Sequence, residues 1–326
     1  MLVYKESEIL MKIIIWFPII EDGKNGTYIY DGSYLEKSLN ILITQKNMKI
    51  MAVSLNKKVD TVNKKVDTVL FGKKLRYIDE NDLKKFNDIC ILAVGGKSFG
   101  MDVICKKAYT LGITVENIIC DWILCLPGFS FDKYYALKTS KLSIISSHCF
   151  GGIVSHLLGL KFYSPFVNLF LTEKDFIKFL KDPLMYVDEK LFYVRREMDK
   201  GGEFDFPVCK MGDIELHMNH YNTFEEAAEK WYDRIKRINW FNLCIQMYTD
   251  NPNILEEFDE LPYGKKICFT SFESNLPSAY YVNKELCPWK DKKYDLSDYV
   301  IYHALQPYQY DIFDMLLYGK RTDITI

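Results

Sequence analysis

Hydrophobic and polar positions alternate regularly through the first part of the chain. Short apolar runs that predict buried strands occur at residues 12–18, 49–55, 88–96 and 116–124. Longer amphipathic stretches that predict helices lie between them, at residues 33–47, 80–86 and 98–113. In the first of these helices Leu35, Leu39 and Leu42 share one face, and Ser33 is placed to cap its start. This alternation predicts a Rossmann-like parallel sheet with helices on both faces over residues 1–138.

The pattern changes after residue 138. Strands are expected at residues 141–147, 212–221 and 265–272, with an extended aromatic segment at 161–171. Helices are expected at 151–160, 172–182, 222–240 and 311–319. The second and third of these helices open with capping pairs, Thr172 with Asp175 and Thr223 with Glu226. Residues 139–326 are therefore expected to form a second α/β domain, with a mixed sheet in a three-layer α/β/α arrangement.

The strand expected at residues 212–221 has two different faces. Ile214, Leu216 and Met218 would face the core, because side chains alternate along a strand. The opposite face would carry four polar side chains, Asp213, Glu215, His217 and Asn219.

Composition narrows the function classes. The chain has 326 residues, which favours two domains over one, and 48% of them are hydrophobic. A net charge of −2 without a Lys/Arg block argues against a nucleic-acid partner. The longest early apolar run has eight residues, so no transmembrane segment is expected, and any membrane contact would be peripheral. Nine cysteines without a C-x-x-C pair suggest reduced thiols in a cytoplasmic protein, with no metal site.

The stretch "SSHCFGG" at residues 146–152 holds the strongest candidate chemistry. Cys149 lies where the strand should end and a helix should begin, and a helix N-terminus lowers the pKa of a thiol. The amides of Phe150, Gly151 and Gly152 would be positioned to hold a developing oxyanion. The alternative is a buried cysteine that packs in a tight turn, with the two glycines allowing close helix–sheet contact.

A nucleophilic cysteine needs a base, and His217 is the candidate. Glu215 and Asp213 lie two and four residues before His217 on the same predicted strand face, where they could orient its ring. His148, Asn219 and His220 are placed with the substrate-binding candidates, together with Phe150, Gly151 and Gly152. His217 alone is equally consistent with a structural histidine. The constellation would suit transfer of an acyl group through a thioester.

The first domain offers a weaker candidate. The first strand leads into "PIIEDGKNG" without G-x-G-x-x-G, so no dinucleotide cofactor is expected. Gly95, Gly96 and Lys97 follow a predicted strand and precede a helix, which can bind an anion such as a phosphate of the substrate. An ordinary strand–helix turn is the alternative.

Two blocks carry a resemblance to a known family. "SIISSHCFGG" with the segments that follow it, and "GDIELHMNHY…EEAAEKW…RINW", resemble a bacterial family of unknown function associated with exopolysaccharide or capsule biosynthesis. The resemblance covers about residues 139–320. Relatives usually carry Asn and often Trp beside the cysteine, where this chain has His148 and Phe150. The resemblance implies a pathway and no catalytic residues.

Three functions remain open at this stage. The first is a transferase of surface-polysaccharide assembly that moves an acyl or glycosyl group to a sugar with Cys149 and His217. The second is a metal-independent glycosyltransferase that binds a sugar nucleotide, with the cysteine only shaping its turn. The third is a non-catalytic protein that binds a carbohydrate or a partner, which an aromatic content of 15% permits.

Overall fold

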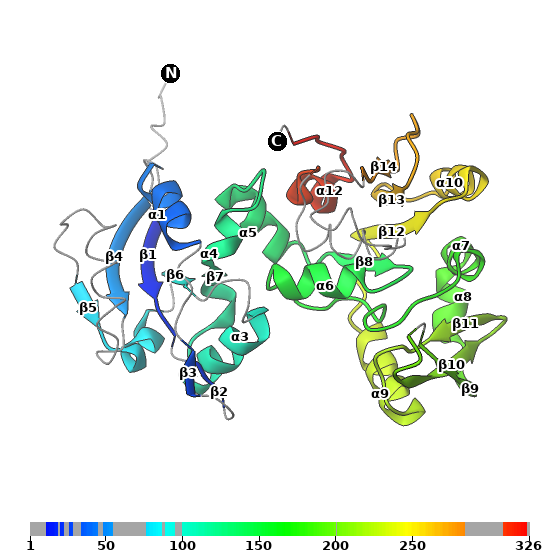
Figure 1. Ribbon diagram of the computed structural model, residues 1–326, viewed down its shortest axis with the longest axis horizontal. Helices are drawn as coiled ribbons and strands as arrows, with labels where there is room; N and C mark the ends of the chain where they lie inside the picture. Colours follow the sequence, from blue (N-terminus) through cyan, green and yellow to red (C-terminus); the bar gives the residue numbers. More distant parts are fainter. Residues whose placement is uncertain are drawn as a thin grey trace, which may run out of the picture. The chain divides into compact units, whose positions relative to one another are not determined.

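The computed structural model describes most of the chain, in two compact units (Figure 1). The described residues are 11–18, 20–22, 26–28, 34–44, 48–54, 76–86, 89–94, 100–199, 201–283 and 309–324. The units divide between Leu126 and Pro127, earlier in the chain than the boundary expected at residue 138.

The N-terminal unit is built on a five-stranded parallel sheet in the order β5-β4-β1-β6-β7. Its strands are β1 (Met11–Trp16), β4 (Met48–Ser54), β5 (Arg76–Ile78), β6 (Cys90–Ala93) and β7 (Ile118–Cys120). A short antiparallel pair is formed by β2 (Ile20–Asp22) and β3 (Gly26–Tyr28). The central strand β1 is apolar on both faces, because residues 13–16 are at most 1% exposed.

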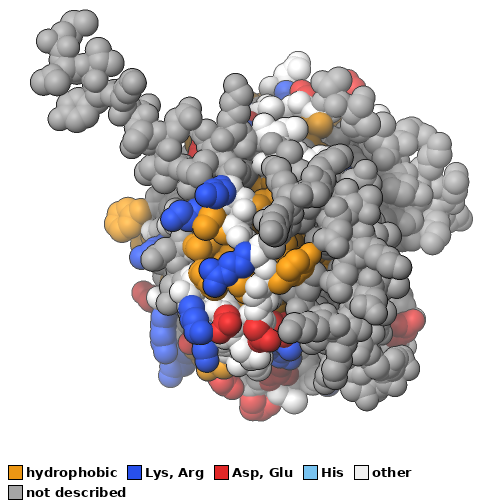
Figure 2. All heavy atoms as spheres, turned by 90° about the vertical axis from the view of Figure 1, so that its left-hand side faces the viewer, with side chains coloured by type: hydrophobic (Ala, Val, Ile, Leu, Met, Phe, Trp, Pro, Cys, Tyr) orange, Lys and Arg blue, Asp and Glu red, His pale blue; other side chains and the backbone are white. Residues whose placement is uncertain are grey.

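Helical segments connect these strands. They are α1 (Leu35–Thr44), α3 (Gly100–Thr110), α4 (Asp121–Leu124) and the 3₁₀ turns η1 (Glu80–Lys85) and η3 (Val115–Asn117). Leu39 and Leu42 of α1 are buried as predicted, whereas Ser33 lies outside the described residues. On the face of the chain drawn in Figure 2, the described Lys and Arg side chains stand among acidic and apolar ones.

The C-terminal unit contains a four-stranded parallel sheet in the order β14-β13-β12-β8. Its strands are β8 (Ser143–Ser146), β12 (Leu243–Thr249), β13 (Lys266–Thr270) and β14 (Ala279–Tyr281). The helices in the described part of this unit have the following bounds: α5 (Phe131–Thr139), α6 (Phe150–Leu157), α7 (Glu173–Lys181), α8 (Pro183–Asp188), α9 (Phe224–Ile235), α10 (Pro252–Asp259) and α12 (Ile312–Tyr318).

The same unit holds a separate antiparallel sheet in the order β11-β10-β9. Its strands are β9 (Leu191–Met198), β10 (Asp205–Met211) and β11 (Ile214–His217). The prediction of a single mixed sheet is therefore wrong. The antiparallel strands are joined by short turns, one of which places Gly212 at φ +59°, so they pair with one another and not with the helix-linked parallel strands.

One apolar core joins the two sheets of the C-terminal unit. It includes Ile145 and Ile245 from the parallel sheet, Leu216 from the antiparallel sheet, and Phe176 and Trp231 from α7 and α9. The predicted inward side chains of β11, Ile214 and Leu216, and the following Met218 are at most 1% exposed. The caps predicted at Thr172 and Thr223 also form, since their hydroxyls accept from the amides of Asp175 and Glu226.

Helices α5 and α12 are tied together inside this unit. Lys133 of α5 lies 2.7 Å from carboxylate oxygens of both Asp311, the N-cap of α12, and Asp314. A Cβ added at Gly128, which has φ +73°, would lie 2.0 Å from Asp311 Oδ2. The close packing of α5 on α12 explains why α5 belongs to the C-terminal unit.

Candidate functional site

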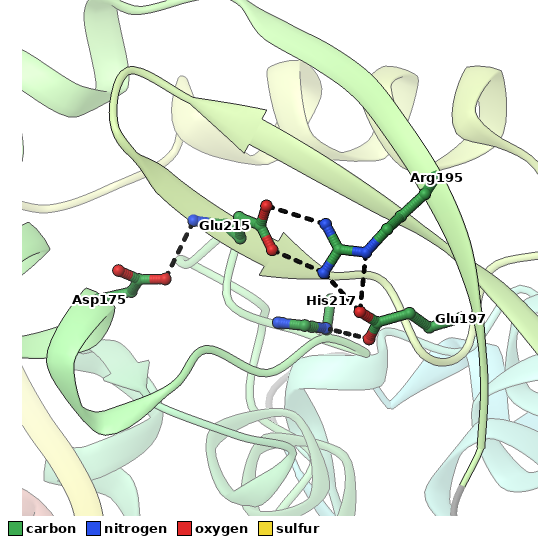
Figure 3. A network of polar contacts seen from close by, with 5 residues as sticks. All are labelled: Asp175, Arg195, Glu197, Glu215 and His217. Carbon is green, nitrogen blue, oxygen red and sulfur yellow. Dashed lines mark hydrogen bonds and ion pairs between the residues drawn. The ribbon is translucent and has the colours of Figure 1, made fainter.

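The antiparallel sheet carries a chain of charged side chains on its outer face (Figure 3). Arg195 of β9 donates to both oxygens of Glu215 on β11, from Nη1 at 2.9 Å and Nη2 at 2.8 Å. Arg195 Nε also donates to Glu197 Oε1 at 2.9 Å, and Nη2 contacts the same oxygen. Such a planar guanidinium held on two sides has little rotational freedom, so it fixes both carboxylates.

His217 at the end of β11 is held by this chain of contacts. Its Nδ1 lies 2.9 Å from Glu197 Oε2. Its ring stacks on Phe170, with the centroids 4.4 Å apart and an angle of 9° between the planes. The backbones of His217 and Phe170 also exchange two hydrogen bonds of 2.9 Å. Ring and backbone are therefore fixed together.

The charge on Glu197 decides which group donates in its contact with His217. Burial works to raise the pKa of Glu197, but the hydrogen bond from Arg195 and the nearby charges outweigh it, so this pKa lies below its usual value. An ionised Glu197 can only accept a hydrogen bond, so Nδ1 of His217 is the donor in this contact. In the described part of the chain no hydrogen-bond partner faces Nε2, which points away from Glu197 in Figure 3.

The other two carboxylates that were expected to orient His217 do not contact its ring. Glu215 is bound to Arg195, which also lowers its pKa. Asp213 lies in the turn before β11, where its oxygens accept from Lys178 at 2.9 Å and Tyr186 at 2.7 Å. The orienting carboxylate is Glu197 of β9, whose side chain reaches His217 of β11 across the intervening strand β10.

Cys149 lies beside Asn219, which belongs to the sequence block "GDIELHMNHY". The thiol is at the start of α6 with 9% exposure, and burial raises its pKa. A hydrogen bond with the side chain of Asn219 works in the opposite direction. Its side-chain partner is thus Asn219, while the ring of His217 is engaged by Glu197 and Phe170. A thiol with a raised pKa and an amide neighbour is poorly suited to nucleophilic catalysis.

The two glycines after Cys149 serve packing. A Cβ added at Gly151 would lie 2.8 Å from Ser146 Oγ, and one at Gly152 would lie 3.1 Å from Val167 Cγ1. The amide of Gly151 already donates to Ser146 Oγ at 3.1 Å. This amide is therefore not open to an oxyanion, and the close approach of α6 to β8 accounts for the motif.

The remaining candidates in the C-terminal unit are dispersed. Phe150 is fully buried against Phe269, with centroids 5.5 Å apart. His148 is 5% exposed and its ring meets Tyr248 edge-on at 4.6 Å. His220 is exposed, although nearby atoms remove enough water to lower its pKa.

The anion-binding candidates Gly95, Gly96 and Lys97 lie outside the described residues. The described residue before them, Val94, donates its amide to the carbonyl of Trp16 at 2.8 Å. The carboxyl ends of β6 and β1 are thus adjacent in the sheet.

Sequence patterns missed the residues that complete the histidine site. Arg195 and Glu197 lie in "LFYVRREM", which alternates weakly because its strand is exposed on both faces. The spacing of two between a basic and an acidic residue was the available signal, since such residues share one face of a strand. For Phe170 the sequence predicted only that it belongs to an extended segment, and it did not indicate which residue its ring would contact.

Comparison with known proteins identifies the family of this chain. A model described as "Domain of unknown function (DUF1919)" matches residues 124–316, which is more than half of the sequence. The chain belongs to the DUF1919 family. An uncharacterized protein of Haemophilus influenzae is 35% identical over 181 residues, which cover 50% of this chain and 84% of the relative.

The DUF1919 match includes every residue of the histidine site. It also includes Cys149 and Asn219 and nearly the whole C-terminal unit. Within the described ranges, no three His, Cys, Asp or Glu side chains are grouped so that they could hold a metal ion. No helix of the described part of this DUF1919 protein has the length and apolar character needed to cross a bilayer.

Proposed function

We propose that this protein transfers a glycosyl or acyl group to a sugar hydroxyl, with His217 as the general base. The observation that carries the proposal is the 2.9 Å contact between Nδ1 of His217 and Glu197, which directs Nε2 away from the carboxylate, where the neutral ring would accept a proton. Carboxylate-oriented imidazoles act in this way in many transfer enzymes.

The chemistry follows from that arrangement. Nε2 of His217 takes the proton of the sugar hydroxyl as its oxygen forms a bond to the transferred carbon. The bond between that carbon and the leaving group of the donor breaks, and the leaving group departs with the electron pair. The imidazolium is stabilised by Glu197 and later returns its proton to water. Arg195 and Glu215 act as positioning residues, because they touch Glu197 and not the acceptor.

The pathway part of the proposal rests on resemblance. "SSHCFGG" and "GDIELHMNHY" resemble sequences of bacterial exopolysaccharide or capsule biosynthesis proteins. We therefore expect the acceptor to be a precursor of a surface polysaccharide, handled on the cytoplasmic side of the membrane. Cys149 has a packing role in this proposal, supported by its low exposure and raised pKa.

The experiment compares the wild type with His217→Gln and Glu197→Gln. Each protein is incubated with UDP-, GDP- and CMP-sugars or acyl-CoA thioesters and an oligosaccharide acceptor, and the product is measured by mass spectrometry. We expect kcat to fall roughly 10²–10⁴-fold in His217→Gln, with a smaller fall in Glu197→Gln and little change in KM. Glu189→Gln, on an exposed side chain outside the network, is the matched control. Unchanged turnover in His217→Gln would refute the proposed base.

A second candidate activity concerns the N-terminal unit alone. Its sheet order β5-β4-β1-β6-β7 runs outward in both directions from β1, and doubly wound sheets bind nucleotides beside such a reversal. A Rossmann-like unit of this kind would bind the nucleotide of a sugar nucleotide without a metal. A rise in melting temperature with UDP, GDP or CMP that Lys97→Ala abolishes would support nucleotide binding, and unchanged melting with all three would count against it.

A further inference from the structure

Strand β9 is an edge strand with an unusual concentration of exposed apolar side chains. In the order β11-β10-β9, its only described strand partner is β10. We define the β9 patch as the exposed apolar side chains on β9 and beside it: Phe192 (59%), Tyr193 (51%), Val194 (41%), Met198 (61%), Phe204 (46%) and Tyr232 (39%). Tyr232 lies beside the strand, since its hydroxyl accepts from the amide of Leu191 at 2.8 Å.

An edge strand that is exposed to solvent makes a protein prone to unwanted association with other chains. Free edge strands offer unpaired backbone groups to other chains, and soluble proteins usually protect them with proline or lysine. The eight residues of β9 include neither, and its three charged residues, Arg195, Arg196 and Glu197, are all engaged in ion pairs within their own chain. The β9 patch also gathers several large apolar side chains in one place, whereas ordinary surfaces expose such side chains singly. It therefore indicates an interaction site.

We propose that the β9 edge pairs with the same edge of a second copy of this chain, as antiparallel strands related by a twofold axis at Arg196. In this register Arg195 of one copy lies opposite Glu197 of the other, on both sides of the axis. The ladder of β9 with β10 is regular from Arg195 to Met198, and Val194 is the extra residue of a bulge at its end. The regular part of the strand therefore pairs an arginine with a glutamate on each side of the axis, as a twofold interface requires.

The two arginines at the axis are already neutralised. Each Arg196 pairs with Asp205 of its own chain, with Nε 2.5 Å from Oδ2, and also donates to the carbonyl of Asn222. The ordering of Arg196 within its own chain reduces repulsion between the two copies.

The available area fits a dimer. Large side chains bury roughly 150–250 Å² each, so the half-exposed β9 patch contributes roughly 600 Å² per copy. Backbone and arginine atoms along the strand bring this toward the ~800 Å² per partner that is usual for a stable interface. Pairing would extend the three-stranded sheet across both copies.

The first test is the oligomeric state of the full chain. Sedimentation velocity should show a dimer for the wild type, and the double variant Val194→Lys/Met198→Lys should raise the dimer dissociation constant at least ~100-fold. Phe241→Lys, at a fully exposed residue that is not part of β9 or of the β9 patch, should remain dimeric. A wild type that is monomeric at about 100 µM, far above the usual dissociation constants, would overturn the proposal.

The second test fixes the register and does not depend on the first variant folding. Opposed residues in an antiparallel pair have Cα atoms about 4.5–5.5 Å apart, within disulfide range. Arg196→Cys should therefore form a covalent dimer on mild oxidation, whereas Phe241→Cys should behave as the wild type does. A dimer in which Arg196→Cys does not crosslink would show that another surface or register is used, and would refute the twofold axis at Arg196.

Discussion

Substituting alanine for Gly151 tests the packing explanation of the "SSHCFGG" motif. The new methyl group would lie 2.8 Å from Ser146 Oγ, 3.0 Å from Ile144 Cγ2 and 3.3 Å from the Ile144 carbonyl oxygen. Ser146 cannot yield freely, because its hydroxyl accepts from the Gly151 amide and donates to the His148 carbonyl. Either the hydroxyl rotates and loses both hydrogen bonds, or α6 moves away from β8.

The magnitude follows from these contacts. Overpacking a tight core costs about 1–3 kcal/mol, and each lost hydrogen bond costs about 1 kcal/mol. Alanine recovers about 1 kcal/mol of helix propensity. We therefore expect the free energy of unfolding to fall by about 2 kcal/mol, which lowers the melting temperature of a unit of this size by roughly 4–8 °C.

The assay is urea and thermal unfolding followed by tryptophan fluorescence. Gly264→Ala is the matched control, because an added Cβ there meets no atom within 4 Å. The double variant Ser146→Ala/Gly151→Ala should show coupling between the sites, since it removes the hydroxyl that the methyl group meets. If Gly151→Ala unfolds like Gly264→Ala, close packing does not explain the glycine.

Two further predictions concern ionisation. Iodoacetamide at pH 7.5 should modify Cys149 more slowly than the partly exposed Cys105, because burial raises the pKa of the Cys149 thiol; peptide mapping that finds Cys149 labelled first would contradict this. Glu197 and Glu215 have lowered pKa values when folded, so their stabilising contribution is present above the ordinary pKa of about 4.3 and is lost as the pH falls through the folded values. Arg195→Met should therefore flatten the acid decline in urea midpoint, and an unchanged pH dependence would argue against the network.

Strongly periodic segments allowed much of the fold to be predicted from the sequence. The helices at α7 and α9 begin at their predicted caps, and β11 buries its predicted apolar face. Local patterns of this kind depend only on neighbours along the chain. The division into two sheets depends on which distant strands pair, and this information is not contained in any local period.

The candidate site illustrates the same limit. His217 was selected from the sequence as a candidate base, but its partner Glu197 lies 20 residues earlier. Glu197 belongs to β9, whose exposed side chains do not show the alternation by which a strand is predicted. Cys149 and Asn219 were both singled out, yet the contact between them was not foreseen. Residue type marked these positions, and only the cross-strand register decided which groups meet.

The clamp between Lys133 and the carboxylates of Asp311 and Asp314 makes the C-terminal unit depend on its last helix. During synthesis, Lys133 leaves the ribosome some 180 residues before its counter-charges do. Helix α5 cannot complete this contact before α12 has been synthesised, so the unit is completed only after residues 311–318 have emerged. A chain shortened before residue 311 would lack this closure, and proteases should degrade it far faster than the full-length protein.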